Sequence, residues 1–260
     1  MDDSVMQSYD QLAGAYHLIF ADWRQAIRRQ GGVLDEIIRH QLEGAPLSVL
    51  DCSCGIGTQA IGLAERGYRV HGTDISAAAV GRAKREAELA GVEITFGVAD
   101  LRALDTQIDG RFEIVMSCDN ALPHLLSAED VRLAVHNMGA KLRDGGLLLV
   151  SARDYDALVA ERPRSTLPRV FDDADGRRVV FQVWDWLDDG RTYTVTQFIL
   201  HEKKEGAWET NSYATRYRAL SRHELDEVLD DEGFSDVTWL MPDESGYYQP
   251  IVTARKRRRA

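Results

Sequence analysis

Several features that would point to particular functions are absent from this chain of 260 residues. It has no apolar run of about 20 residues, the length that a membrane-spanning helix needs. Lysine and arginine total 31 against 42 acidic residues, and this net charge of −11 lacks the basic excess of a nucleic-acid-binding face. The start Met1-Asp2-Asp3-Ser4 lacks the basic and apolar segments of a secretory signal. We therefore expect a cytoplasmic protein that binds small molecules rather than nucleic acid or membrane.

Cysteine is also scarce, with three residues in the chain. Cys52 and Cys54 lie two positions apart and Cys118 is far away in the sequence, which matches no zinc-ligand spacing. We expect reduced thiols and no metal. The stretch Arg255–Arg259 is basic, and such a short terminal run is most simply a solvated tail.

The first half of the chain alternates short apolar runs with amphipathic segments, a pattern typical of a parallel sheet with helices on both faces. Runs rich in Val, Ile and Leu predict strands at Leu47–Asp51, Tyr68–Thr73, Glu93–Val98, Phe112–Ser117 and Leu147–Ser151. Helical spacing and caps predict helices at Thr58–Arg66, Ser76–Ala90 and Glu129–Leu142, the last ended by Asp144-Gly145-Gly146. The fold class is therefore α/β.

The segments on either side of this core have a different character. Apolar residues at helical spacing across Ser8–His40 predict one or two helices that cover the site. Arg178–Trp186 and Thr192–His201 are rich in Val, Thr and aromatics and flank a turn sequence, which predicts a hairpin, with a third strand at Trp208–Leu220.

The last part of the chain returns to the core pattern. Ser221 and Glu224 form a capping-box pattern at the start of a predicted helix, Ser221–Glu232, and strands are predicted at Val237–Leu240 and Tyr248–Ala254. We expect a helical lid at 1–44, the α/β core at 45–154, an antiparallel layer at 155–220 and a return to the sheet at 221–260.

The loop after the first predicted strand has the glycines of a nucleotide-binding site. Gly55–Ala60 fits the dinucleotide fingerprint GxGxxA, and Asp74 follows it at the end of the next predicted strand. In a dinucleotide site the first glycine directly follows the strand, because backbone amides must reach a pyrophosphate. Here Asp51 and three more residues precede Gly55, which favours S-adenosylmethionine (SAM) over NAD.

Asp51, Asp74 and Asp100 each end a predicted strand. The carboxyl ends of parallel strands form the edge where ligands bind in open α/β sheets. We expect Asp51 and the backbone of Ser53 to hold the methionyl ammonium of SAM, Asp74 to accept its ribose hydroxyls, and Asp100 with Leu101 to contact its adenine. Each aspartate taken alone also fits a strand-terminating turn.

The motifs VLDCSCGIG, GTDIS, VADL and SCDNALPHLL occur in that order at residues 49–57, 72–76, 98–101 and 117–126. Together they resemble the class I SAM-dependent methyltransferases, and most closely the glycine/sarcosine N-methyltransferase-like group, over nearly the whole chain. The resemblance implies a Rossmann-like fold with a seven-stranded, mostly parallel sheet, an N-terminal helical lid and an inserted antiparallel layer. It also implies cofactor contacts from the lid and core, at Tyr16, Trp23, Arg28 or Arg29, Gly55, Ile75 and Cys118.

The same resemblance places Asn120 beside the transferred methyl group, where its amide is expected to accept the hydrogens of the acceptor amine. Tyr16 and His124 are the other candidate catalytic residues. A histidine after Pro123 and beside leucines is equally typical of a packed structural residue.

The stretch Arg153-Asp154-Tyr155-Asp156 resembles the RNYD-type sequence of glycine methyltransferases, with Asp154 where asparagine is usual. The resemblance implies that Arg153 grips the substrate carboxylate, since a guanidinium can form two parallel hydrogen bonds to it. Tyr155 and Tyr217 are further substrate-binding candidates, with Tyr213 and Arg218 nearby on the same predicted strand. The alternative for Arg153 is a surface salt bridge to Asp154 or Asp156.

Three hypotheses follow. The leading one is in-line methyl transfer from SAM to the deprotonated nitrogen of a small amino acid or amine such as glycine or sarcosine. The second is N- or O-methylation of a larger specialised metabolite, and the third is a SAM- or NAD-binding protein that transfers no methyl group. The expected partner is a small-molecule acceptor, and a second copy of the chain is a further candidate.

Overall fold

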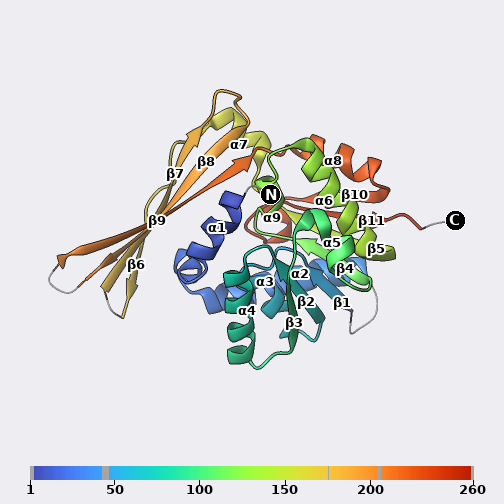
Figure 1. Cartoon of the computed structure of the whole chain (residues 1–260), viewed down its shortest axis with the longest axis horizontal. Helices are drawn as coiled ribbons and strands as arrows, with labels where there is room; N and C mark the ends of the chain where they lie inside the picture. The colour runs from blue at the N-terminus through green and yellow to red at the C-terminus, as the bar shows by residue number, and fades with distance from the viewer. Residues whose placement is uncertain (1–2, 43–46, 175, 204–205, 259–260) are drawn as a thin grey trace.

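The computed structural model describes residues 3–42, 47–174, 176–203 and 206–258 (Figure 1). Within these ranges the core is a seven-stranded sheet with the order β10-β11-β5-β4-β1-β2-β3. Strands β1 to β5 run parallel, whereas β11 is antiparallel to both β5 and β10. The strands are β1 (Ser48–Asp51), β2 (Arg69–Asp74), β3 (Ile94–Val98), β4 (Phe112–Ser117), β5 (Leu142–Ser151), β10 (Phe234–Leu240) and β11 (Ile251–Lys256). The expected mostly parallel α/β sheet is confirmed.

Helices cover both faces of this sheet. On one face α2 (Trp23–Gln41) and α3 (Thr58–Ala64) pack against strand residues such as Val49 and Ile114, with α4 (Ala77–Ala90) beside them. On the other face α6 (Ala128–Lys141) and α8 (Arg222–Asp231) pack against Leu50 and Val115. Successive strand side chains point to opposite faces, so a sheet covered on both sides needs apolar residues at every position.

Short helical turns follow several of the strands, and two of them carry residues that line the site. They are η2 (Leu101–Ala103), α5 (Leu104–Gln107), η3 (Leu122–His124), α7 (Tyr155–Glu161) and α9 (Pro242–Ser245). Helix α7 lies in a stretch for which the sequence predicted no helix, and Asp154 caps it by accepting a hydrogen bond from the Ala157 N–H.

The predicted helix caps are present, but some predicted bounds are wrong. Ser76 caps α4 by accepting from the Ala79 N–H. Helix α6 ends at Lys141 because Leu142 is already extended and pairs with Phe112, so Asp144–Gly146 lie inside β5 instead of ending the helix. Strand β11 begins at Ile251 rather than Tyr248, since Pro250 has no N–H for the ladder.

The capping box expected at the start of α8 forms only in part. Ser221 accepts a hydrogen bond from the Glu224 N–H at 3.2 Å. The Glu224 carboxylate is taken instead by the guanidinium of Arg218. The helix therefore keeps its serine cap, while the acid anchors the end of the neighbouring strand.

A second, antiparallel sheet projects from one side of the core in Figure 1. It consists of β6 (Arg169–Asp173), β7 (Gly176–Trp186), β8 (Thr192–Glu202) and β9 (Trp208–Arg218) in that order. The predicted hairpin is confirmed as β7 and β8, and its turn uses Gly190 in the left-handed conformation. Strand β6 adds an edge strand that the sequence did not predict.

The N-terminal segment lies between this sheet and the core (Figure 1) and consists of α1 (Asp3–Leu12) and η1 (Tyr16–Ile19). Ser8 of α1 donates to the Ala214 carbonyl of β9 at 2.6 Å, and Asp10 accepts from the Ser76 hydroxyl at 2.5 Å. Arg169 and Arg178 of the antiparallel sheet donate to backbone carbonyls at Leu18, Ile19 and Phe20. The segment, here called the lid, is thus bonded on both sides.

The first two residues of the basic tail differ from the expectation of a solvated run, whereas Arg257 and Arg258 are exposed as expected. Lys256 donates to the carbonyls of Gly139 and Leu142, and Arg255 donates to those of Gln41 and Gly145. Three of these carbonyls lie at the C-terminal ends of α2 and α6, where the helix dipole attracts cations, and that of Gly145 lies in β5. Arg259 lies outside the described residues. Among the helices of the described ranges, none has the length and apolar character to span a membrane.

Helices α2 and α3 pack so closely that glycine is required at their contact. A Cβ at Gly31 would lie 2.6 Å from the Gly62 backbone, whereas one at Gly81 of α4 would have its nearest neighbour at 3.8 Å. Replacing helical glycine by alanine normally stabilises by about 0.5–1 kcal/mol. We predict that Gly81→Ala raises the free energy of unfolding by up to about that amount, while Gly31→Ala lowers it by about 1–3 kcal/mol through overpacking.

Urea unfolding of both variants measures this difference. Equal effects of the two substitutions would show that α2 and α3 can move apart at no cost.

Candidate active site

A cavity with about 650 Å³ of empty space, part of it open to solvent and here called the inner cavity, lies at the carboxyl ends of β1, β2 and β4. Its lining comes from the loops after these strands and from the lid residues Val5, Tyr9 and Tyr16. Chain order changes direction at this point of the sheet, because β1 has β2 on one side and β4 on the other. Such switch points are where open α/β sheets bind ligands.

Asp51 ends β1 and immediately precedes the inner-cavity residues Cys52 and Ser53, but it is not itself among the residues that line the cavity. It is 1% exposed, and its Oδ2 has no hydrogen-bond partner. Burial raises the pKa of Asp51 to about 8, and the Ser53 N–H opposes this rise only weakly from 3.4 Å. A buried carboxylate oxygen without a partner favours a cationic ligand at this position.

Asp74, at the end of β2, lines the inner cavity opposite the glycine loop. Its two carboxylate oxygens accept hydrogen bonds from the Gly55 N–H at 2.8 Å and the Ser76 N–H at 2.9 Å. Burial raises its pKa, and these two N–H groups counter the rise. Gly55 has a φ of +52°, a left-handed conformation that favours glycine, and it adds no side-chain bulk to the cavity wall.

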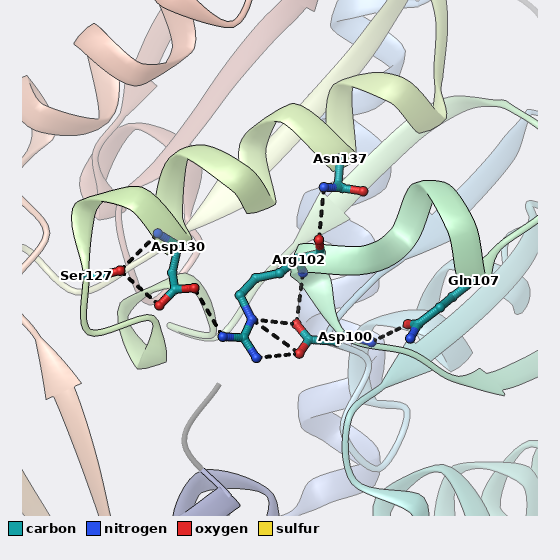
Figure 2. Close-up of polar contacts among 6 residues, drawn as sticks. All are labelled: Asp100, Arg102, Gln107, Ser127, Asp130 and Asn137. Atoms are coloured by element: carbon teal, nitrogen blue, oxygen red, sulfur yellow. Dashed lines mark hydrogen bonds and ion pairs between the residues drawn. The ribbon is translucent and has the colours of Figure 1, made fainter.

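Ser53, Ile75, Leu101 and Cys118, also predicted as cofactor contacts, line the inner cavity as Gly55 and Asp74 do, while Asp100, like Asp51, does not. Figure 2 shows why: Arg102 holds the Asp100 carboxylate in a fork, at 2.7 and 3.2 Å, and reaches Asp130 at 3.1 Å. Asp100 also accepts from the Arg102 N–H and so caps η2. It thereby fixes the turn that places Leu101 in the cavity, and an adenine contact for Asp100 remains a prediction.

Trp23 and Arg29 also lie away from the inner cavity lining. The Trp23 indole donates to the Thr58 hydroxyl at 2.9 Å, and Thr58 is a lining residue at the start of α3. Arg29 donates to the Gly246 carbonyl at 3.3 Å beside an open cleft of about 1220 Å³. Trp23 is thus placed to support the cavity wall, and the role of Arg29 toward a cofactor remains a prediction.

A second cavity of about 610 Å³, here called the outer cavity, lies between the lid, the antiparallel sheet and the ends of β4 and β5. It shares Tyr9, Tyr16 and Asp119 with the inner cavity. Asn120, Arg153 and Tyr217, all predicted to bind substrate, line the outer cavity. The structure therefore places a second chamber directly beside the first.

Arg153 enters the outer cavity within a cage of aromatic side chains. Its Cζ lies 4.7 Å from the ring centre of Trp184 and 4.8 Å from that of Tyr217, and its Nη1 donates to the Tyr193 hydroxyl at 2.9 Å. Asp154 and Asp156, the alternative partners, pair instead with Arg222. Among the described residues no carboxylate forms an ion pair with Arg153, so its charge is available to an anionic ligand.

Asn120 is 2% exposed, and its amide orientation is fixed by its neighbours. Its Oδ1 accepts from the Arg153 backbone N–H and from the Tyr155 hydroxyl, both at 3.0 Å, whereas its Nδ2 has no partner. The oxygen is occupied, so the side chain can only donate to a ligand. This corrects the expectation that Asn120 accepts the hydrogens of an acceptor amine.

Tyr155 is buried behind Asn120 and lines neither cavity. Arg153 donates to Tyr193, and Tyr155 donates to Asn120, so the 2.9 Å contact between the two hydroxyls runs from Tyr193 to Tyr155. This chain of directed hydrogen bonds holds the guanidinium and the amide in a fixed relation.

His124 lines the inner cavity and contacts the lid. Burial lowers its pKa to about 3, so the ring is neutral near pH 7. Its Nδ1 lies 2.9 Å from the Arg216 carbonyl and must donate there, which leaves Nε2 to accept from the Tyr9 hydroxyl at 2.8 Å. The histidine therefore orients a lid tyrosine and is not a proton donor at neutral pH.

Sequence reasoning did not assign several residues that the structure brings to the site: Tyr9, Asp119, Trp184, Tyr193 and Tyr248. Asp119 accepts hydrogen bonds from the Tyr16 hydroxyl at 2.6 Å and from the Tyr248 hydroxyl. The sequence signal for Asp119 was its position beside Asn120 in the motif SCDNALPHLL. The alternation of aromatics in β7 and β8 was the signal for Trp184 and Tyr193, but it does not distinguish packing from a pocket.

Known proteins resemble the chain at both the sequence and the fold level. Residues 49–146 match the methyltransferase domain family. The glycine/sarcosine N-methyltransferase of Parasynechococcus marenigrum (strain WH8102) is 33% identical over 138 residues, which are 53% of this chain and 48% of that protein. The enzyme of the same name from Aphanothece halophytica is 25% identical over 201 residues, covering 77% of this chain and 71% of that one. The chain thus spans about half the length of the first of these relatives.

Among solved structures, SAM-bound CalS10, an amino pentose methyltransferase from Micromonospora echinaspora involved in calicheamicin biosynthesis, superposes with a TM-score of 0.72. The match covers 88% of this chain and 91% of that one at 17% identity. At this identity the likeness concerns the fold alone. The expected classification is supported: residues 49–146 match the methyltransferase domain family, and the chain has the fold of the class I methyltransferases.

Proposed function

We propose that this protein is a SAM-dependent N-methyltransferase of a small amino acid or amine, with glycine and sarcosine as the first acceptors to test. The observation that carries the proposal is the guanidinium of Arg153, which reaches a cavity beside the cofactor region without a carboxylate partner among the described residues. A cation held in this way favours an acceptor with a carboxylate.

The inner cavity fits SAM in the chemistry of its donors and acceptors. Asp51, buried and with a free oxygen, is suited to the methionyl ammonium, and Asp74 to the ribose hydroxyls. Ile75 and Leu101 supply apolar surface for the adenine. Bound SAM supplies an electrophilic methyl group on a sulfonium.

The outer cavity fits the acceptor. Arg153 and the unpartnered Nδ2 of Asn120 can both donate to a carboxylate, and the directed hydrogen bonds through Tyr193 and Tyr155 keep the two donors in place. Tyr217 covers the guanidinium from one side. The names of the relatives, glycine/sarcosine N-methyltransferase, agree with such an acceptor.

Methyl transfer from a sulfonium disperses charge rather than creating it, so alignment and exclusion of water contribute more than a strong base. The lid serves both needs, because Tyr9 and Tyr16 line the two cavities where they meet. Hydrogen bonds from these tyrosines to His124 and Asp119 close the lid onto the core.

SAM binding is predicted to release a proton from Asp51. With a pKa of about 8 this carboxyl is mostly protonated at pH 7, and a bound ammonium favours its charged form. Affinity for SAM therefore rises from pH 6 to about pH 8, and binding at pH 7 releases close to one proton. Calorimetry in buffers of different ionisation enthalpy measures the released fraction.

Two comparisons assign that proton. Asp51→Asn abolishes the release and weakens SAM binding, and 5′-methylthioadenosine, which lacks the amino-acid part of SAM, binds the unaltered protein without release. Unchanged proton release in Asp51→Asn would assign the proton to another group and remove Asp51 from the ammonium site.

Arg153 is predicted to set the Michaelis constant for an amino-acid acceptor. Charge-assisted hydrogen bonds contribute about 1.5–3 kcal/mol, so Arg153→Ala is expected to lower kcat/KM for glycine or sarcosine about 10- to 100-fold while the Kd for SAM stays unchanged. Arg222→Ala, which removes a guanidinium paired outside both cavities, is the matched control and keeps full activity. Equal turnover by Arg153→Ala at subsaturating acceptor would contradict its role as carboxylate anchor.

A larger amine or hydroxyl acceptor is the second candidate function. The outer cavity shares Asp119, Arg153 and Gln182 with the open cleft, so an acceptor bigger than an amino acid has room to extend outward. The fold-level likeness to an amino pentose methyltransferase agrees with this option. A mass-based product screen of amino acids, amino sugars and phenols with SAM decides between the two.

A further inference from the structure

We propose that Asp119 binds the nitrogen of the acceptor, so that the site selects molecules that carry an amine as well as an anionic group. This inference rests on the proposed function, which it deepens by naming the acceptor class as a zwitterionic amino acid. It also fills the role that Asn120 cannot take, because the Asn120 oxygen already accepts two hydrogen bonds.

Asp119 lies where the methyl donor and the acceptor are proposed to meet. It lines the inner cavity, the outer cavity and the open cleft, so it stands where a methyl donor and an acceptor arriving from outside would meet. Tyr9 and Tyr16 share the boundary between the two cavities, but their hydroxyl hydrogens are directed at His124 and Asp119. Asp119 is therefore the charged hydrogen-bond acceptor at this boundary.

The surroundings of Asp119 keep it able to accept further hydrogen bonds. The hydroxyls of Tyr16 and Tyr248 donate one bond to each carboxylate oxygen, and each oxygen retains a second lone pair. Burial raises its pKa, while these two hydroxyls and the charge of Arg153 oppose the rise. An N–H of the acceptor can donate to one of these remaining lone pairs whether the nitrogen is charged or neutral.

Arg153 and Asp119 line the same outer cavity with opposite charges, yet no ion pair joins them within the described residues. Two unlike charges that face one space without pairing form a dipole matched to a molecule with a carboxylate at one end and an amine at the other. An acceptor held by both would have its nitrogen at the Asp119 end, next to the inner cavity.

The backbone fixes this arrangement. Asp119 and Asn120 have φ values of +60° and +64°, a conformation that costs most residues about 1–2 kcal/mol but that Asp and Asn tolerate best. The Asp119 N–H donates to the Ser151 hydroxyl at 2.8 Å, and the Asn120 N–H donates to the Ser151 carbonyl at 3.1 Å. These bonds to β5 hold the two side chains in adjacent positions of one turn.

Three probes separate the two charges of the acceptor: glycine carries both, acetate only the anion and methylammonium only the cation. Each is titrated by calorimetry into the full chain saturated with S-adenosylhomocysteine, for the unaltered protein, Asp119→Asn and Arg153→Lys. Asn suits the left-handed backbone at this position, so Asp119→Asn changes the charge and keeps the turn.

The expected pattern is a double dissociation. Asp119→Asn lowers the affinity for glycine and for methylammonium by at least about tenfold. It leaves the affinity for acetate unchanged or raises it, because a negative charge has been removed. Arg153→Lys lowers the affinity for glycine and acetate and leaves the affinity for methylammonium unchanged. Asp156→Asn, which removes a carboxylate outside both cavities, changes none of the three affinities.

Two controls distinguish amine binding from lid closure. Tyr16→Phe and Tyr248→Phe remove hydrogen bonds to Asp119 but keep its carboxylate, and they are expected to shift glycine and acetate affinities together. If either reproduces the selective loss of glycine, Asp119 acts only through the lid and the inference is overturned. A fall in S-adenosylhomocysteine affinity in Asp119→Asn also overturns it, because the carboxylate then belongs to the cofactor.

The remaining outcomes separate this inference from the proposed function. If Asp119→Asn loses binding of both acetate and glycine, or of neither, the assignment of Asp119 is overturned. The proposal of a carboxylate-binding acceptor site at Arg153 then remains intact. Absence of glycine and acetate binding in the unaltered protein, with methylammonium binding that still depends on Asp119, overturns the amino-acid acceptor and keeps Asp119 as the amine site.

Discussion

The turn at the end of β4 is the constraint on which both cavities depend. Asp119 and Asn120 adopt left-handed backbone conformations there, and both N–H groups are bonded to Ser151 at the end of β5. Strained conformations persist where the surroundings over-determine them, and they concentrate at functional sites. One strand end thus delivers Cys118 to the inner cavity, Asn120 to the outer cavity and Asp119 to both.

From this turn the remaining polar groups of the site are connected by hydrogen bonds of known direction. Asn120 accepts from Arg153 and Tyr155, and Arg153 donates to Tyr193. The lid joins the same network, because Tyr16 donates to Asp119 and Tyr9 to the neutral His124. The residues that hold the lid and those that line the outer cavity therefore meet at the same turn, through the neighbours Asp119 and Asn120.

Most of the fold followed from local sequence. Strands β1 to β4 and the helices α3, α4 and α6 were predicted within a few residues, since a doubly covered parallel sheet needs continuous apolar strands and caps at helix starts, whereas β5 begins five residues before its predicted start at Leu147. Predictions were wrong where tertiary pairing overrode local signals: Leu142 pairs with Phe112, so Asp144–Gly146 became part of a strand. The short elements β6 and α7 had no clear periodicity to reveal them.

The sequence by itself determined the sheet, the glycine loop and the strand-end aspartates, because each depends on residues close together in the chain. It also indicated Arg153 as a substrate residue, through a resemblance. Only the tertiary structure decided which charged groups are paired: Arg102 reaches Asp130, Arg222 pairs with Asp154 and Asp156, and Arg153 has no carboxylate partner among the described residues. The direction of hydrogen bonds was also decided only by the tertiary structure, because the orientation of the Asn120 amide depends on Arg153 and Tyr155, more than thirty positions away. Pairing of charges and donors is set by distance in space, and the order of residues along the chain does not contain it.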